Sequence, residues 1–177
     1  MKYIKLFLVS VLSFFVLFTL IGLLFPSHIK TVKAIVVNKE KKQVLDELRA
    51  QARWVNWHPF FYDPTHARIE NAGENKVVFF CNGNELRFSD IRSDSNSLFF
   101  TMNAGSMEAE DQVMALPISS DSTQTQVMWS ETEQLKWYPW ERFRGLLLER
   151  SKGIYLDTAL HRFKIYIESG REIIPGN

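Results

Sequence analysis

An uninterrupted apolar segment near the start constrains this chain more than any other feature. Residues 6–25 read LFLVSVLSFFVLFTLIGLLF and contain no charged side chain. Twenty helical residues extend about 30 Å, the thickness of the hydrocarbon core of a bilayer. A cleavable signal peptide has a shorter apolar region, about 7–15 residues, followed by small residues at the cleavage site. This run ends instead in LLFPSHIK. We therefore expect an uncleaved, single-pass membrane anchor.

The lysines around this segment bear on its orientation. Lys2 and Lys5 precede it, and five lysines follow it between residues 30 and 42. Lys and Arg are enriched on the cytoplasmic side of a membrane span, so the larger number of lysines after the segment favours a cytoplasmic location for the rest of the chain. A short tail before a first span often takes the opposite orientation, so both stay open. The single cysteine, Cys81, excludes an intramolecular disulfide and is compatible with a reducing compartment.

The charge balance limits the class of partner. The chain carries 21 basic and 20 acidic side chains. A nearly neutral domain offers no electrostatic basis for binding nucleic acid, so we expect no nucleic-acid partner. The sequence does not indicate an oligomeric state.

After the anchor, the hydrophobic period changes twice. Residues 31–38 are β-branched and predict a strand. Residues 39–57 then show helical spacing, which predicts an amphipathic helix and a second short turn that ends at His58-Pro59. From His66 to about Glu131, short apolar runs alternate with turn residues, including the hairpin signal Asn82-Gly83. This pattern predicts a meander of antiparallel strands.

The last forty residues return to helical spacing. Residues 137–153 predict a proline-started lead-in helix that stops or bends near Gly153. Beyond it, an apolar stripe recurs at four, three and four residues and predicts a long helix with one buried face. The stripe consists of Leu156, Leu160, Phe163 and Ile167. Together these elements predict an α+β domain with about six or seven antiparallel strands around the C-terminal helix.

Three local motifs resemble the SRPBCC superfamily, the START-like group that includes polyketide cyclase/dehydrase-related proteins. WVNWHPF resembles the W-x-x-W-x-P turn of that family, and TQTQVMWS is similar to its G-T-x-V-x-W strand without the glycine. ALHRFKIYIE is similar to its closing G-L-x-N-L-K-x-x-x-E, with Ala and Phe in place of Gly and Leu. The residues in register there are Ala159, Leu160, Phe163, Lys164 and Glu168.

The resemblance implies a helix-grip fold, in which a curved antiparallel sheet wraps around a long C-terminal helix. It applies in particular to bacterial members with an N-terminal membrane span, so the expected location is the bacterial inner membrane. We expect residues 1–28 to form one transmembrane helix and a tether. Residues 29–170 should form the helix-grip domain, and residues 171–177 a C-terminal tail.

The aromatic segment WVNWHPFFYDPTH admits three interpretations. The resemblance implies that Trp54 and Trp57 pack against the sheet. A loop that touches the membrane is the second interpretation, since Trp and Tyr favour headgroups. His58, Asp63 and His66 are the residues of a third, a metal site, but their spacing does not follow a zinc pattern. We therefore expect no metal.

In this family a cavity between sheet and helix holds lipids, sterols, polyketides or other apolar molecules. Alternation along the strands, together with the resemblance, predicts the residues that line it. They are Trp57, Phe88, Phe100, Met102, Met107, Asp111, Trp129 and Leu160. Asp111 is the polar member, and a carboxyl group that faces such a cavity has a raised pKa. Asp90 follows the same phase in its strand, unless a bulge turns it outward.

Three classes of function stay open. We favour a membrane-tethered module that binds a lipid or another hydrophobic small molecule. The alternatives are a cyclase- or dehydratase-type enzyme, or a scaffold that binds a partner and has a filled cavity. The chain contains no Ser-His-Asp order, phosphate loop or zinc-helix motif. We therefore assign no catalytic residue and no cofactor.

Overall fold

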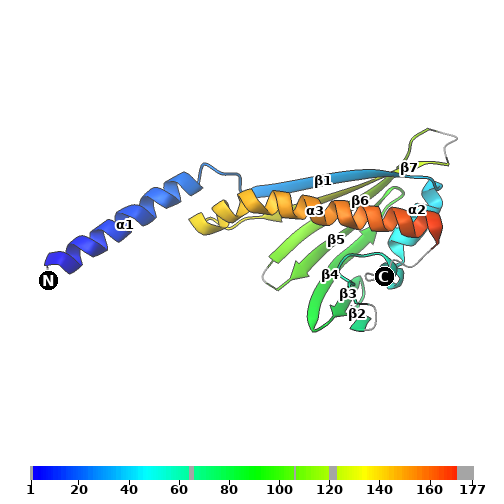
Figure 1. The fold of residues 1–177 in the computed structure, drawn as a ribbon, viewed down its shortest axis with the longest axis horizontal. Helices are drawn as coiled ribbons and strands as arrows, with labels where there is room; N and C mark the ends of the chain where they lie inside the picture. Colours follow the sequence, from blue (N-terminus) through cyan, green and yellow to red (C-terminus); the bar gives the residue numbers. More distant parts are fainter. Residues whose placement is uncertain (1, 64–65, 106, 120–122, 171–177) are drawn as a thin grey trace.

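The computed structural model describes residues 2–63, 66–105, 107–119 and 123–170, so the expected tail at 171–177 lies outside the described residues. It contains a long N-terminal helix, a curved antiparallel sheet and a long C-terminal helix (Figure 1). The sheet has seven strands in the order β1-β7-β6-β5-β4-β3-β2. Their bounds are β1 His28–Val37, β2 Ala67–Gly73, β3 Lys76–Cys81, β4 Asn84–Ser93, β5 Ser97–Ala104, β6 Met107–Pro117 and β7 Thr125–Gln134.

The sheet is a meander from β2 to β7, closed by the first strand. Each consecutive pair is antiparallel, and β1 pairs with β7 from His28↔Gln134 to Val37↔Thr125. The β3–β4 connection is the expected Asn-Gly hairpin, because Asn82 and Gly83 both have positive φ, at 48° and 78°. The fold is therefore the α+β helix-grip architecture that the sequence predicts.

Helix α3 (Pro139–Ser169) runs along β1 and the concave side of the sheet (Figure 1). Pro139 begins it at a position that does not need a backbone donor, and Gly170 ends it in the left-handed region at φ 65°. Leu156, Leu160 and Phe163 are buried, as the stripe predicts. Ile167 is half-buried and packs on the same core.

The predicted break at Gly153 is wrong, because α3 is continuous through this residue. A glycine inside a helix lowers its stability without necessarily ending it. Here the glycine allows a close approach, since a Cβ at this position would lie 3.3 Å from Cε of Lys33 on β1.

Two short helices cover the end of the sheet far from α1 (Figure 1). They are α2 (Lys41–Arg49) and the 3₁₀ helix η1 (Gln51–Asn56). Helix α2 buries its apolar face, and Trp54 and Trp57 are each only 1% exposed. The packing interpretation of the tryptophan pair is thus confirmed. Burying large apolar side chains of this kind contributes about 1.5–3 kcal/mol each.

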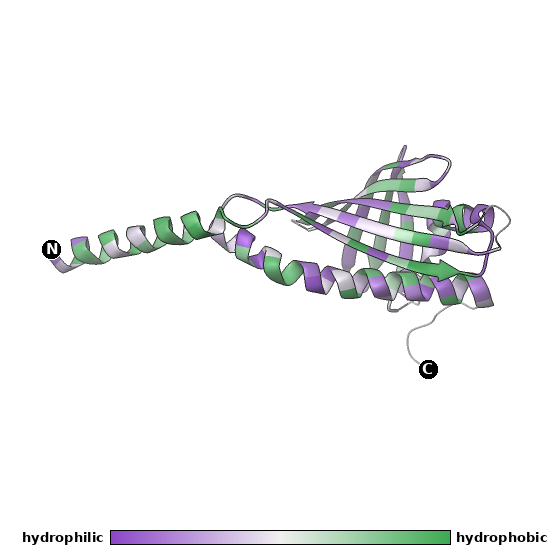
Figure 2. Ribbon diagram, turned by 90° about the horizontal axis from the view of Figure 1, so that it is seen from above, coloured by the Kyte–Doolittle hydropathy of each residue, from purple (hydrophilic) through white to green (hydrophobic). Residues whose placement is uncertain are grey.

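Helix α1 (Lys2–Gly22) extends away from the domain and is apolar beyond its first turn, which holds Lys2 and Lys5 (Figure 2). It is the one helix among the described residues that is long and apolar enough to cross a membrane. Its last turn meets the first turn of α3, where a Cβ on Gly22 would lie 3.2 Å from Cα of Pro139. The rings of Phe18 and Phe25 lie 6.1 Å and 5.4 Å from that of Phe143.

Candidate functional site

Six of the eight predicted lining residues lie in the buried core between the sheet and α3. Each of these six is at most 4% exposed. They are Trp57, Phe88, Phe100, Asp111, Trp129 and Leu160. The other two, Met102 and Met107, lie on the same inner face but remain half-buried.

Closely spaced rings fill the half of the interior next to η1. The ring centroids of Trp57 and Trp129 are 6.4 Å apart, and those of Phe88 and Phe100 are 5.4 Å apart. His58 is fully buried among these rings, with its imidazole stacked on Trp54 at 5.5 Å. Burial is the main cause that lowers the pKa of His58 from 6.5 to about 3, and the charge of Arg162 adds to it. The imidazole is therefore neutral at physiological pH.

A buried carboxyl group adjoins the rings. The indole Nε1 of Trp129 donates a hydrogen bond of 2.7 Å to Oδ1 of Asp111. Oδ2 of Asp111 has no hydrogen-bond partner among the described residues. Burial raises the pKa of Asp111 well above 3.8, and the charge of Glu131, its cross-strand neighbour, raises it further. Together these effects favour the protonated form, in which the group is both a donor and an acceptor.

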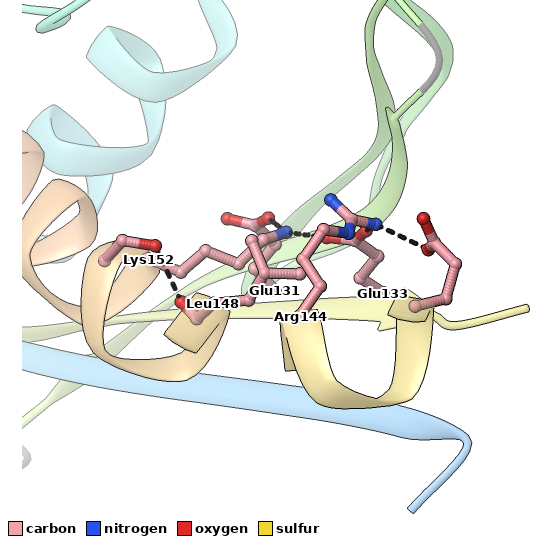
Figure 3. Close-up of polar contacts among 7 residues, drawn as sticks. Glu131, Glu133, Arg144, Leu148 and Lys152 are labelled. Carbon is pink, nitrogen blue, oxygen red and sulfur yellow. Dashed lines mark hydrogen bonds and ion pairs between the residues drawn. The ribbon is translucent and has the colours of Figure 1, made fainter. Parts of the chain in front are cut away.

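An ion-pair network begins at Glu131, the cross-strand neighbour of Asp111, and runs toward the start of α3 (Figure 3). Lys152 on α3 pairs with Glu131 and, at 2.7 Å, with Glu133. Arg144 then bridges Glu133 and Glu141, at 2.9 Å each. Burial alone would lower the pKa of Lys152, but the bonds to the two glutamates outweigh it and raise the pKa. The lysine is therefore charged, and together with Arg144 it places two positive charges beside the two buried glutamates.

Tyr155 connects the ring cluster to the acidic groups. Its hydroxyl lies 3.4 Å from Nε2 of His58. Burial, and then the charges of Asp111 and Glu131, raise the pKa of this hydroxyl, so it stays protonated. We call His58, Asp111, Glu131, Lys152 and Tyr155 the interior polar cluster. These groups can hydrogen-bond to a guest molecule or exchange a proton with it.

Most of the interior polar cluster was not predicted from the sequence, although a signal for it is present there. The alternation that places Val127 and Trp129 inward continues to Glu131 and Glu133. Lys152 likewise lies one helical turn before Leu156 on the buried stripe of α3. Charged residues of both signs at inward-facing positions are expected to pair with one another inside the protein, because charged side chains are rarely buried without a partner.

Asp90 does not belong to this site. The β4 register shifts between Ser89 and Arg92, and Asp90 has φ 53° and is exposed. A bulge therefore turns this carboxylate outward, as the alternative interpretation supposed.

The three residues of the metal interpretation are not brought together. Asp63 and His66 pair at the surface, with 2.8 Å between Oδ2 and Nδ1. His58 lies instead within the aromatic core. The described part of the chain holds no group of three side chains suited to binding a metal ion.

The interior has an apolar margin that α3 leaves partly uncovered. Met102, Ala104 and Met107 are half-buried on the inner faces of β5 and β6, and Ala109 is buried beside them. The register pairs Met102 with Ala109 and Ala104 with Met107. We call these four residues the methionine margin. Its member Ala109 lies one inward position from Asp111 along β6.

The sequence matches no protein-family model and no curated protein. Several solved structures are similar in fold. A START superfamily protein from Mycobacterium smegmatis has 11% identity and a TM-score of 0.60, over 79% of this chain and 97% of that chain. A protein from Deinococcus radiodurans has 16% identity and a TM-score of 0.51, over 80% of this chain and 99% of that one.

A third similar structure is a putative protein in the dynemicin biosynthetic locus. It has 11% identity and a TM-score of 0.60, over 81% of this chain and 48% of that chain. At sequence identities this low, the similarity to these structures is evidence for the fold alone. The chain has an SRPBCC/START-like helix-grip fold, with a long apolar helix before it.

Proposed function

We propose that this chain is a membrane-tethered module that binds a lipid or another hydrophobic small molecule between its sheet and α3. The observation that carries the proposal is the unpartnered Oδ2 of Asp111, buried beside apolar rings. A buried polar atom without a partner costs about 1–3 kcal/mol. A guest that carries a hydroxyl or carbonyl group would remove this cost by bonding to the protonated carboxyl.

The surroundings of Asp111 support an apolar guest with one polar end. Nε1 of Trp57 is a second buried polar atom without a partner among the described residues, and it offers a donor. The methionine margin provides flexible apolar side chains that adapt to irregular shapes. Binding would then follow the usual division, in which apolar burial supplies affinity and a few polar groups fix orientation.

The tether supports a guest that is dissolved in the membrane. Only residues 23–27 separate α1 from β1. If α1 spans the bacterial inner membrane, this short link holds the interior close to the bilayer and raises its effective concentration for membrane-dissolved molecules. The flanking lysines favour the cytoplasmic side for the domain.

An enzyme of cyclase or dehydratase type is the second candidate, and one observation favours it. Asp111 has a raised pKa, and neutral His58 and Tyr155 lie in the same cluster. Such a constellation suits proton transfer to a bound substrate. A hydrophobic guest that leaves the protein chemically unchanged would favour the binding module over this candidate.

Retention of a guest by the full-length protein tests the proposal. The protein is solubilised from membranes in mild detergent, and native mass spectrometry measures any small molecule that stays bound. Met107→Trp is expected to fill the methionine margin and abolish retention, and Asp111→Asn to weaken it. Met114→Trp is the matched control, because Met114 lies on the outer face of the same strand, opposite Met128. Equal retention by Met107→Trp and Met114→Trp, or none in the wild type, would leave the partner-binding scaffold as the better account.

A further inference from the structure

The segment before and within the first turns of α3 exposes large apolar side chains. Trp137, Trp140 and Leu147 are 61%, 60% and 75% exposed, and Leu146 is 56% exposed. Tyr138 stacks on Trp140 with 4.6 Å between ring centroids. We call Trp137, Tyr138, Trp140, Leu146 and Leu147 the interfacial segment. A contiguous exposed apolar patch of this kind marks an interaction surface.

The position of this segment indicates what covers it. Pro139, at its centre, meets Gly22 at the last turn of α1, and Phe143 contacts Phe18 and Phe25. Leu23 and Leu24, which follow α1, are also exposed. If α1 spans the bilayer, its end lies at the boundary between hydrocarbon and headgroups. The interfacial segment, packed against that end, then lies at the same depth.

The chemistry of the segment fits that depth. Trp and Tyr concentrate at membrane–water interfaces, because their rings are amphipathic. Lys136 lies 5.9 Å above the ring of Tyr138, where a cation can meet lipid phosphates. The opposite face of this part of α3 packs on the domain, since Gly145 approaches Leu135 and Ile29. One face is thus buried in protein and the other is apolar, as in helices that lie in an interface.

A groove beside this segment adds positive charge. It has a volume of about 600 Å³ and lies between β1 and α3. Lys30, Lys33 and Arg150 line it together with Glu149 and Asp157, and Lys33 pairs with Asp157, so the net charge of the groove is +1. Such cations attract the anionic headgroups of a lipid surface, at about 1 kcal/mol per basic residue near the surface.

We infer that the interfacial segment is embedded in the headgroup region of the bilayer, so that the first turns of α3 touch the membrane while the rest of the helix runs away from it along the sheet (Figure 1). The inference rests on α1 crossing the bilayer, which is part of the proposed function. A second copy of this chain is the competing occupant, because Trp140, Leu147 and Ile154 recur every seven residues. The contact of the segment with α1 favours the lipid surface.

Tryptophan fluorescence in lipid vesicles tests the inference with the full-length protein. Of the five tryptophans, Trp137 and Trp140 are exposed, whereas Trp54, Trp57 and Trp129 are buried and serve as internal controls. Vesicles made from lipids with bromine near the headgroup end of the acyl chain should quench the wild-type emission. The double variant Trp137→Phe/Trp140→Phe should lose most of this quenching.

Two further variants keep the test decisive. Leu147→Asp retains both reporters and should reduce the quenching by placing a charge in the interface. Ile165→Asp, on the exposed part of α3 far from α1, should leave it unchanged. If the protein is fully embedded in the vesicles but its emission is not quenched, the inference is overturned. This holds whether or not chemical cross-linking detects a dimer.

The same samples separate this inference from the proposed function. The double tryptophan variant is expected to retain any bound guest, and Met107→Trp is expected to retain the quenching. Loss of guest with intact quenching would count against the binding module alone. Intact guest retention with unquenched wild-type emission would count against the interfacial position alone.

Discussion

Trp129 and Asp111 lie on neighbouring strands, and the indole Nε1 of the first donates a 2.7 Å hydrogen bond to the carboxyl group of the second. This bond holds a carboxyl group inside an apolar domain, while burial and Glu131 raise its pKa. Nearby, His58 is neutral because burial lowers its pKa to about 3. The interior therefore contains two titratable groups that are neutral in the folded protein. Each makes the free energy of unfolding depend on pH.

The two groups should impose opposite pH dependences on stability. The unfolded chain protonates His58 below about pH 6.5, whereas the native state does not, so the contribution of His58 is lost as pH falls from there. The slope is about 1.4 kcal/mol per pH unit. Asp111 has a raised pKa, so its contribution is complete below about pH 3.8 and is lost as pH rises. Between these values the two slopes should largely cancel.

Removing one of the two groups at a time should reveal the pH dependence of stability that the other imposes. His58→Phe should leave a protein that becomes less stable as pH rises between about 4 and 6.5. Asp111→Asn should show the reverse trend over the same range. Denaturant titrations of the full-length protein at a series of pH values measure both. Parallel profiles for the two variants would contradict the assigned protonation states.

The stripe of α3 makes a prediction about the core. Leu160 is 2% exposed, so Leu160→Ala should lower the free energy of unfolding by about 2–5 kcal/mol. Ile165 lies on the same helix and is 40% exposed, and Ile165→Ala should cost much less. Chemical denaturation compares the two, and equal losses would show that α3 does not pack as described.

The ion-pair network makes a prediction about buried charge. Lys152→Met leaves Glu131 and Glu133 without their lysine and should cost about 3–5 kcal/mol. Replacing both glutamates by glutamine in the same protein should recover much of this loss. Lys164→Met is the control, because its 3.9 Å pair with Glu168 is partly exposed and should contribute at most about 1 kcal/mol. Unfolding free energies that do not distinguish Lys152 from Lys164 would refute the buried pairing.

The apolar helix makes a prediction about membrane attachment. The mature protein should retain residues 6–25 and stay with the membrane fraction after a carbonate wash. Fractionation followed by N-terminal analysis checks both points. A soluble form that begins near Ser27 would show that α1 is a removable signal peptide.

Most of the fold follows from local patterns in the sequence, but most of the site does not. Alternation, the Asn82-Gly83 turn and the stripe of α3 each act within a few residues, so they predict strands, a hairpin and a helix. The pairing of Lys152 with Glu131 depends on how α3 lies across β7, which no local pattern contains. The outward turn of Asp90 depends on one extra residue in β4, which shifts the phase of the strand. The close approach of Lys33 to Gly153 within the continuous helix α3 likewise joins segments far apart in the sequence.

The pairing of β1 with β7 also constrains how the chain acquires this structure. The first strand of the sheet gains its neighbour, and then its covering helix, only when the last third of the chain has been made. Contacts between such distant segments form slowly, because the chain loses the entropy of closing a long loop before the contacts stabilise it. During that delay β1 presents an unpaired edge next to the apolar residues of α1. The sheet can therefore close around β1 only after β7 and α3 have been made, and the chain is most exposed to aggregation before then.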